Sequence, residues 1–203
     1  PITIRTAQER RNDAIIRGLK RDHAIAWEHV GGLSAPSKMP GLGYSLPASE
    51  CQTGARLAQV PGSTCHDCYA LRGNYGIPSV RRALWARLAS LHALDAWQAA
   101  ICELLDAALE LGAEPFFRWH HSGDIQSVDH LRAMVAIADT FPNVAFWLPT
   151  REYKYVQDAL ALGIVVFPAN LCVRLSAHMV DGKAPDIDLP VSTVYLDSPA
   201  QGR

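Results

Sequence analysis

Strand-like segments recur at a nearly constant interval in the C-terminal half of the chain, and this interval restricts the possible folds most strongly. They begin at Phe116, Val144 and Leu171, which are 28 and 27 residues apart. Such an interval is typical of one strand followed by one helix, and repeated units of this kind form parallel sheets with right-handed crossovers. The sequence therefore predicts an α/β fold, either an open parallel sheet or a partial (β/α) barrel.

The individual elements follow from hydrophobic periodicity and from helix start and stop signals. Strands are predicted over residues 115–121, 143–149, 164–167, 171–176 and 191–196, and helices over 7–30, 79–112, 127–140 and 151–162. Within residues 79–112, Asp95 is a candidate cap for a second helix. Four or five strands are too few to close an eight-stranded barrel.

The segment from residue 31 to residue 77 lacks periodicity and includes the Pro/Gly/Ser-rich run SAPSKMPGLGYSLPAS. An irregular segment of this length is uncommon in a compact domain unless a bound group orders it. We expect residues 1–78 to contain the N-terminal helix and a cysteine-containing irregular region. Residues 79–203 form the βα repeats, and the two parts are expected to make one compact unit.

Three of the five cysteines lie in the irregular region with the spacing Cys51-x13-Cys65-x2-Cys68. The odd number and the lack of a signal-peptide pattern argue against a disulfide framework and favour metal or redox chemistry. A C-x-x-C pair places two thiolates on one turn, and a third thiolate leaves one coordination position open. An iron–sulfur cluster, a zinc ion with a fourth ligand, and reduced structural thiols all remain possible. Cys102 and Cys172 fall in helix and strand patterns, as small buried side chains do.

A second polar cluster, RWHHSGDIQS, follows the first strand of the repeat. Parallel α/β folds place their sites at the carboxyl ends of strands, where this run is expected to lie. Its candidate catalytic residues are a base, a hydroxyl, a carboxylate and an amide: His120 or His121, Ser122, Asp124 and Gln126. Gly123 permits a close approach of the backbone. The alternative is that Asp124 and Ser127 cap the next helix while one histidine packs inside.

The two following strands also end in polar side chains. Arg151 follows one strand, and Arg174, Ser176 and His178 lie at the end of the next. Because parallel strands share one carboxyl edge, we expect these residues to line the same pocket. The two arginines are suited to binding a carboxylate or a phosphate.

Basic side chains are concentrated in two segments although the net charge is only −1. Residues 1–21 contain six lysines and arginines, and the acid-free segment 72–87 contains Arg72, Arg81, Arg82 and Arg87. If the two segments lie on one face of the folded chain, they predict a nucleic-acid partner. If they lie apart, they are ordinary helix faces exposed to solvent. The apolar runs are too short for a membrane span. A cytoplasmic location, with no membrane partner, is therefore expected.

Two long runs of the sequence resemble the phage gene-product-88 family. The runs are SLPASEC…TCHDCYALRGNYG and RWHHSGDIQS…HL…IADTFPNVAFWLPTREY, and the similarity covers roughly residues 38–178. The family is in turn similar to radical S-adenosylmethionine enzymes, through a C-x-x-C-Tyr element that here ends at Tyr69.

This resemblance implies a partial barrel in which the three cysteines hold a [4Fe-4S] cluster and S-adenosylmethionine binds the open iron. Ser122, Asp124 and Arg151 would lie near that cofactor or the substrate. The location it implies is the cytoplasm of a phage-infected or prophage-bearing bacterium.

Three functions are compatible with these features. The first is a radical-type iron–sulfur enzyme that modifies a nucleobase or nucleotide. The second is a zinc-containing base-exchange enzyme, because SGDIQ is similar to the SGGFQ segment of guanine transglycosylases. In that enzyme Asp124 would act as acid, base or nucleophile. The third is a non-catalytic module that is stabilised by a structural metal and binds nucleic acid or protein.

Overall fold

The computed structural model describes residues 6–37 and 39–197 and contains one five-stranded parallel sheet. The strands are β1 (Leu42–Tyr44), β2 (Phe116–Trp119), β3 (Ala145–Thr150), β4 (Leu171–Ser176) and β5 (Val191–Ser192). Their spatial order is β1-β2-β3-β4-β5, so each strand lies beside the next one in the chain. This order lacks the reversal of a doubly wound sheet. The predicted parallel α/β fold is confirmed, and the sheet as described is not closed.

The strand boundaries differ from the predictions at three places. β1 lies within the segment predicted to be irregular, and it pairs with β2 through Leu42 opposite Phe117. Residues 164–167 form a loop rather than a strand, with Val166 82% exposed. Short apolar runs of this kind do not identify a strand by periodicity. The predicted strand 191–196 is reduced to the two residues of β5.

The described part of the chain also contains seven α-helices. They are α1 (Ala7–Asp22), α2 (Ala24–Val30), α3 (Gln52–Leu57), α4 (Pro78–Ser90), α5 (Leu94–Glu110), α6 (Val128–Thr140) and α7 (Tyr153–Ala161). The predicted helix 7–30 is interrupted at His23, and the predicted helix 79–112 is divided between α4 and α5. None of the helices in residues 6–37 and 39–197 has the length and apolar character needed to cross a membrane.

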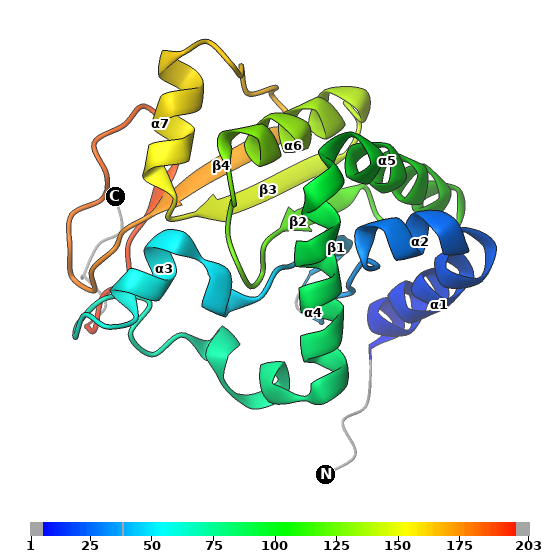
Figure 1. The fold of residues 1–203 in the computed structure, drawn as a ribbon, viewed down its shortest axis with the longest axis horizontal. Helices are drawn as coiled ribbons and strands as arrows, with labels where there is room; N and C mark the ends of the chain where they lie inside the picture. Colours follow the sequence, from blue (N-terminus) through cyan, green and yellow to red (C-terminus); the bar gives the residue numbers. More distant parts are fainter. Residues whose placement is uncertain (1–5, 38, 198–203) are drawn as a thin grey trace.

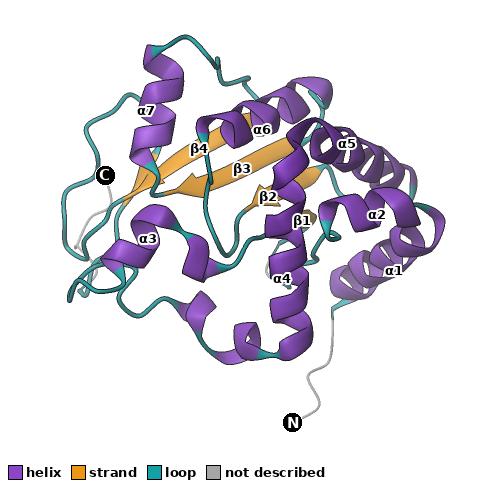
Figure 2. Cartoon of the chain, in the orientation of Figure 1, coloured by secondary structure: helices purple, strands orange, loops and turns teal. Residues whose placement is uncertain are grey.

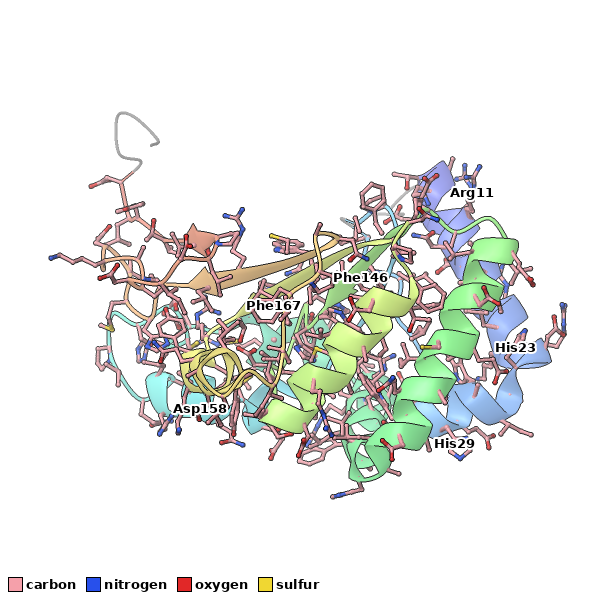
Figure 3. All side chains as sticks on the ribbon, turned by 90° about the horizontal axis from the view of Figure 1, so that it is seen from above. Arg11, His23, His29, Phe146, Asp158 and Phe167 are labelled. Carbon is pink, nitrogen blue, oxygen red and sulfur yellow. The ribbon has the colours of Figure 1, made fainter. Side chains whose placement is uncertain are left out.

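The helices α5, α6 and α7 lie on one side of the sheet (Figures 1 and 3). Side chains of the strands alternate between the two faces, and those directed at the helices are buried, as in Phe117, Phe146 and Val173. The opposite face carries Arg118 and Trp147, which are partly exposed. The strands are therefore apolar on their helix-covered face and mixed on the other.

Buried hydrogen bonds fix the N-terminal part of the chain to this core. The Tyr44 hydroxyl donates to the carbonyl of Val30 at 2.7 Å, and its ring packs edge-on against Trp97 at 5.6 Å. The guanidinium of Arg87 on α4 donates to the carbonyls of Gly32 and Leu33 at 2.8 and 3.0 Å. The segment after β1 is mostly loop and contains the short α3. It extends across the carboxyl edge of the sheet (Figure 2).

Candidate functional site

A cavity of about 440 Å³ lies at the carboxyl ends of β2, β3 and β4. Its walls come from the cysteine segment and from the residues that follow these strands. The predicted site residues that line it are Cys51, Cys65, Cys68, Tyr69, His120, His121, Ser122, Gly123, Asp124, Arg151 and Ser176. The structure therefore brings the cysteine segment and the polar strand ends together.

Three predicted site residues lie outside this cavity. Gln126 turns back, and its side-chain amide donates to the carbonyl of Asp124 at 2.8 Å. Arg174 donates to the carbonyl of Val191 at 2.9 Å, which places it between β4 and β5. The His178 ring stacks on Tyr153 with the ring centres 4.1 Å apart. These side chains support the surrounding loops and do not line the cavity.

The three cysteines face the cavity from two short turns. Cys51 is the residue immediately before α3, and Cys65 and Cys68 lie on the turn that follows the loop after α3. The Cys51 and Cys65 sulfur atoms lie 3.6 and 3.7 Å from the point where a side chain at Gly54 would begin. Within residues 6–37 and 39–197, no three His, Cys, Asp or Glu side chains are arranged to hold a metal ion.

Burial dominates the electrostatics of these thiols. It raises the pKa of Cys51 well above its usual range, and the negative charge of Asp124 and the other two cysteines act in the same direction. Burial also raises the pKa of Cys65, whereas the neighbouring Arg151 lowers it. A bound cation would reverse this balance, because thiolates are the form that coordinates metals.

Hydrogen bonds from the end of β3 hold the cysteine segment in place. The Glu152 carboxylate accepts from the backbone N–H and the hydroxyl of Thr53, both at 2.7 Å, at the start of α3. The Arg151 Nε–H donates to the Thr64 hydroxyl at 2.8 Å, one residue before Cys65. The end of β3 thus positions both turns that carry the cysteines.

The Ser-Gly-Asp sequence after β2 joins the ends of neighbouring strands. The Ser122 hydroxyl donates to the Leu46 carbonyl at 2.9 Å, and the Leu46 N–H donates to the Ser122 carbonyl at 2.9 Å. Gly123 has a φ of +76°, and a Cβ atom there would lie 2.5 Å from the Leu46 Cβ. The close approach predicted for Gly123 is therefore to the chain after β1.

Asp124 connects β2 to β3 and does not cap α6, since the Ser127 hydroxyl does so by accepting from the His130 N–H. The Asp124 carboxylate accepts from the Thr150 hydroxyl at 2.6 Å, the Ile125 N–H at 2.8 Å and the Arg151 N–H at 2.9 Å. Burial raises the pKa of Asp124 to about 6, and these hydrogen bonds oppose the shift. Asp124 is both part of the cavity wall and a link between strand ends.

The two adjacent histidines have different surroundings. His120 is 4% exposed, has a left-handed backbone with a φ of +53°, and neither ring nitrogen has a hydrogen-bond partner in the described structure. Burial lowers the pKa of His120 well below its ordinary value. Burial also lowers the pKa of His121 to about 4, and its Nδ1 lies 2.7 Å from the Ser45 hydroxyl. Both rings are therefore neutral at pH 7.

Arg118 lines the cavity although sequence reasoning did not select it. It lies on β2 between the buried Phe117 and Trp119, so it projects from the face without helices. An arginine between two buried aromatic residues in a strand was the signal that could have identified it. The contribution of Glu152 and Thr53 is visible only in the folded chain, because the two residues are 99 positions apart.

The two basic segments do not form one uncompensated surface. Arg72 pairs with Asp67 at 2.6 Å, Arg21 with Asp22 at 2.6 Å, and Arg11 with Glu114 at 3.5 Å. Arg87 is buried, whereas Arg81 and Arg82 are exposed on α4. Arg5 of the first basic segment lies outside the described residues.

Comparison with known proteins identifies the family of the chain. The family model described as Gene product 88 matches residues 9–197 of the chain. None of the curated proteins and none of the solved structures compared with the chain matches it. The resemblance to the phage family is thereby confirmed over most of the sequence, and the chain belongs to the gene product 88 family.

Proposed function

We propose that the chain is an iron–sulfur enzyme of the radical S-adenosylmethionine type that acts on a nucleobase or nucleotide. Cys51, Cys65 and Cys68 would hold the cluster in the cavity at the carboxyl edge of the sheet. The observation that carries this proposal is that three thiols of one loop segment line the same cavity as polar residues from three strand ends that lie far away in the sequence.

The three thiols suit a soft metal or a cluster by their chemistry, although the described side chains are not already arranged around one. Three thiols are the ligands that iron–sulfur clusters and zinc prefer. Gly54 leaves open the space beside the Cys51 and Cys65 sulfur atoms, which a side chain would occupy. Burial raises the pKa of Cys51, so this thiol would coordinate a metal only if the cation displaced its proton.

A cluster held by three cysteines supplies a one-electron donor and one iron open to a cofactor. The protein would contribute positioning and exclusion of water. Arg151 anchors the turn that carries Cys65, and Glu152 anchors the turn that carries Cys51. His120 and His121 are neutral, so they would present ring nitrogens as hydrogen-bonding groups without adding charge.

A zinc-dependent base exchange with Asp124 as nucleophile is less well supported. Both Asp124 oxygens already accept hydrogen bonds from strand ends and would have to leave them to attack a sugar. The thiol-rich wall of the cavity favours metal chemistry over a purely structural role, because structural thiols need no shared cavity.

The test is reductive cleavage of S-adenosylmethionine by protein that has been reconstituted with iron and sulfide under anaerobic conditions. With dithionite as reductant, 5′-deoxyadenosine should form at a rate proportional to protein, and Cys68→Ser should abolish it. Cys172→Ser is the matched control, because Cys172 is a half-buried thiol outside the cavity. Absence of 5′-deoxyadenosine from reconstituted wild-type protein with an intact cluster spectrum would contradict the radical mechanism.

A further inference from the structure

We propose that Arg118 forms a subsite for the carboxylate or phosphate group of the ligand that enters the cysteine cavity. The inference extends the proposed function by naming the chemistry of the ligand. The reaction that the ligand undergoes rests on the proposed function, whereas anion binding itself does not require a metal.

Arg118 is held at the cavity without a counter-ion among the described residues. Its guanidinium carbon lies 4.4 Å from the centre of the Trp147 ring, on the neighbouring strand β3. Its Nε is buried and has no hydrogen-bond partner in residues 6–37 and 39–197. A buried donor without a partner destabilises the fold, and more so when it is charged. A ligand that accepts from the rest of this guanidinium would supply the missing negative charge and so offset part of that cost.

The acidic groups near the cavity do not neutralise its arginines. The Asp124 carboxylate accepts from Thr150 and from two backbone N–H groups. The Glu152 carboxylate accepts twice from Thr53. Arg151 also lines the cavity and uses its Nε–H for the Thr64 hydroxyl. Two guanidinium groups therefore face a cavity whose nearby carboxylates are already engaged.

The geometry of Arg118 suits a planar or tetrahedral oxyanion. A guanidinium offers its donors as a rigid fork that matches carboxylate and phosphate oxygens. Stacking on Trp147 fixes the guanidinium, so less conformational freedom is lost when a ligand binds. A cavity of about 440 Å³ has room for a ligand of nucleotide size.

The experiment is isothermal titration calorimetry of metal-free protein with three probes: inorganic phosphate, adenosine 5′-monophosphate and S-adenosylmethionine. The first two present phosphate, and the third presents a carboxylate. Wild type is compared with Arg118→Gln and Arg118→Lys. Arg174→Gln is the control, because Arg174 lies on the same face of the sheet but outside the cavity.

Wild type should bind at least one probe, and Arg118→Gln should weaken that binding by about 10- to 100-fold, as expected for losing a hydrogen bond to a charged group. Arg118→Lys keeps the charge but lacks the forked arrangement of donors, so its affinity should lie between those of wild type and Arg118→Gln. Arg174→Gln should bind as tightly as wild type. Tight binding of the phosphate probes would identify a phosphate ligand, and tight binding of S-adenosylmethionine alone a carboxylate ligand.

Failure of all three probes to bind wild type, or equal binding by wild type and Arg118→Gln, would overturn the inference. If Arg118→Gln does not fold, the titrations of wild type and Arg118→Lys decide the question. Cluster assembly is measured separately on reconstituted protein, so loss of the anion subsite and loss of the proposed enzyme function give different results.

Discussion

Replacing Gly123 by alanine should destabilise the protein strongly, because two separate costs coincide at this position. The residue has a left-handed backbone with a φ of +76°, and a Cβ atom would lie 2.5 Å from the Leu46 Cβ and 2.8 Å from the Leu46 carbonyl oxygen. The chain after β1 and the turn after β2 would have to separate. That movement would disturb the two hydrogen bonds between Ser122 and Leu46.

The magnitude follows from these two costs. A left-handed conformation costs a residue other than glycine roughly 1–2 kcal/mol. Overpacking at a site that cannot relax adds about 1–3 kcal/mol. The free energy of unfolding should therefore fall by about 2–5 kcal/mol. At roughly 2–4 °C per kcal/mol for a chain of this size, the melting temperature should fall by about 4–20 °C.

Gly163 provides a matched control, with a φ of +62° and no atom within 4 Å of the position of a Cβ. Gly163→Ala should cost only the backbone term of roughly 1–2 kcal/mol. Thermal and urea unfolding of both variants, followed by circular dichroism, separates the two terms. Equal destabilisation of Gly123→Ala and Gly163→Ala would refute the close packing of Gly123 against Leu46.

Two further predictions concern pH and the cysteine turn. Burial lowers the pKa values of His120 and His130, the latter to about 3. On acidification these histidines are therefore protonated in the unfolded chain before they are protonated in the folded one, so the free energy of unfolding should fall as the pH drops below about 6.5. Asp124, with its pKa raised to about 6, acts in the opposite direction between pH 4 and 6, and urea unfolding at several pH values measures the net slope. Stability that rises steadily on acidification would contradict the dominance of the histidines. Gly54→Ala should reduce metal uptake because its Cβ would lie 2.8 Å from the Cys51 Cβ, whereas Gly76→Ala meets no atom within 4 Å and should load normally. Equal metal content in both variants would disprove the steric role of Gly54.

The sequence predicts β2, β3 and β4 well because their signals are local. Each of them is followed by a helix or a loop with recognisable boundaries, and β4 coincides with the predicted residues 171–176. β1 escapes prediction because it has three residues and is defined by its pairing with Phe117, far away in the sequence. Pairing between distant segments leaves little trace in a single sequence.

The cavity is predictable to the extent that parallel strands share a carboxyl edge. That rule places Asp124 and Arg151 together. It fails for Arg174 and His178, because local hydrogen bonding and stacking turn these side chains away from the cavity. Arg118 is missed because its place between two aromatic residues suggests only that it faces away from them, and the folded structure is needed to show that its side chain reaches the cavity.

The central claim, that Cys51, Cys65 and Cys68 share one iron–sulfur centre, is tested most directly by the iron, zinc and acid-labile sulfide content of anaerobically purified protein. We expect about four iron and four sulfide atoms per chain in wild type. Cys51→Ser should lose most of both, and Cys102→Ser should retain them, because Cys102 is a free thiol outside the cavity. Zinc without sulfide, or iron and sulfide that persist unchanged in Cys51→Ser, would contradict the claim.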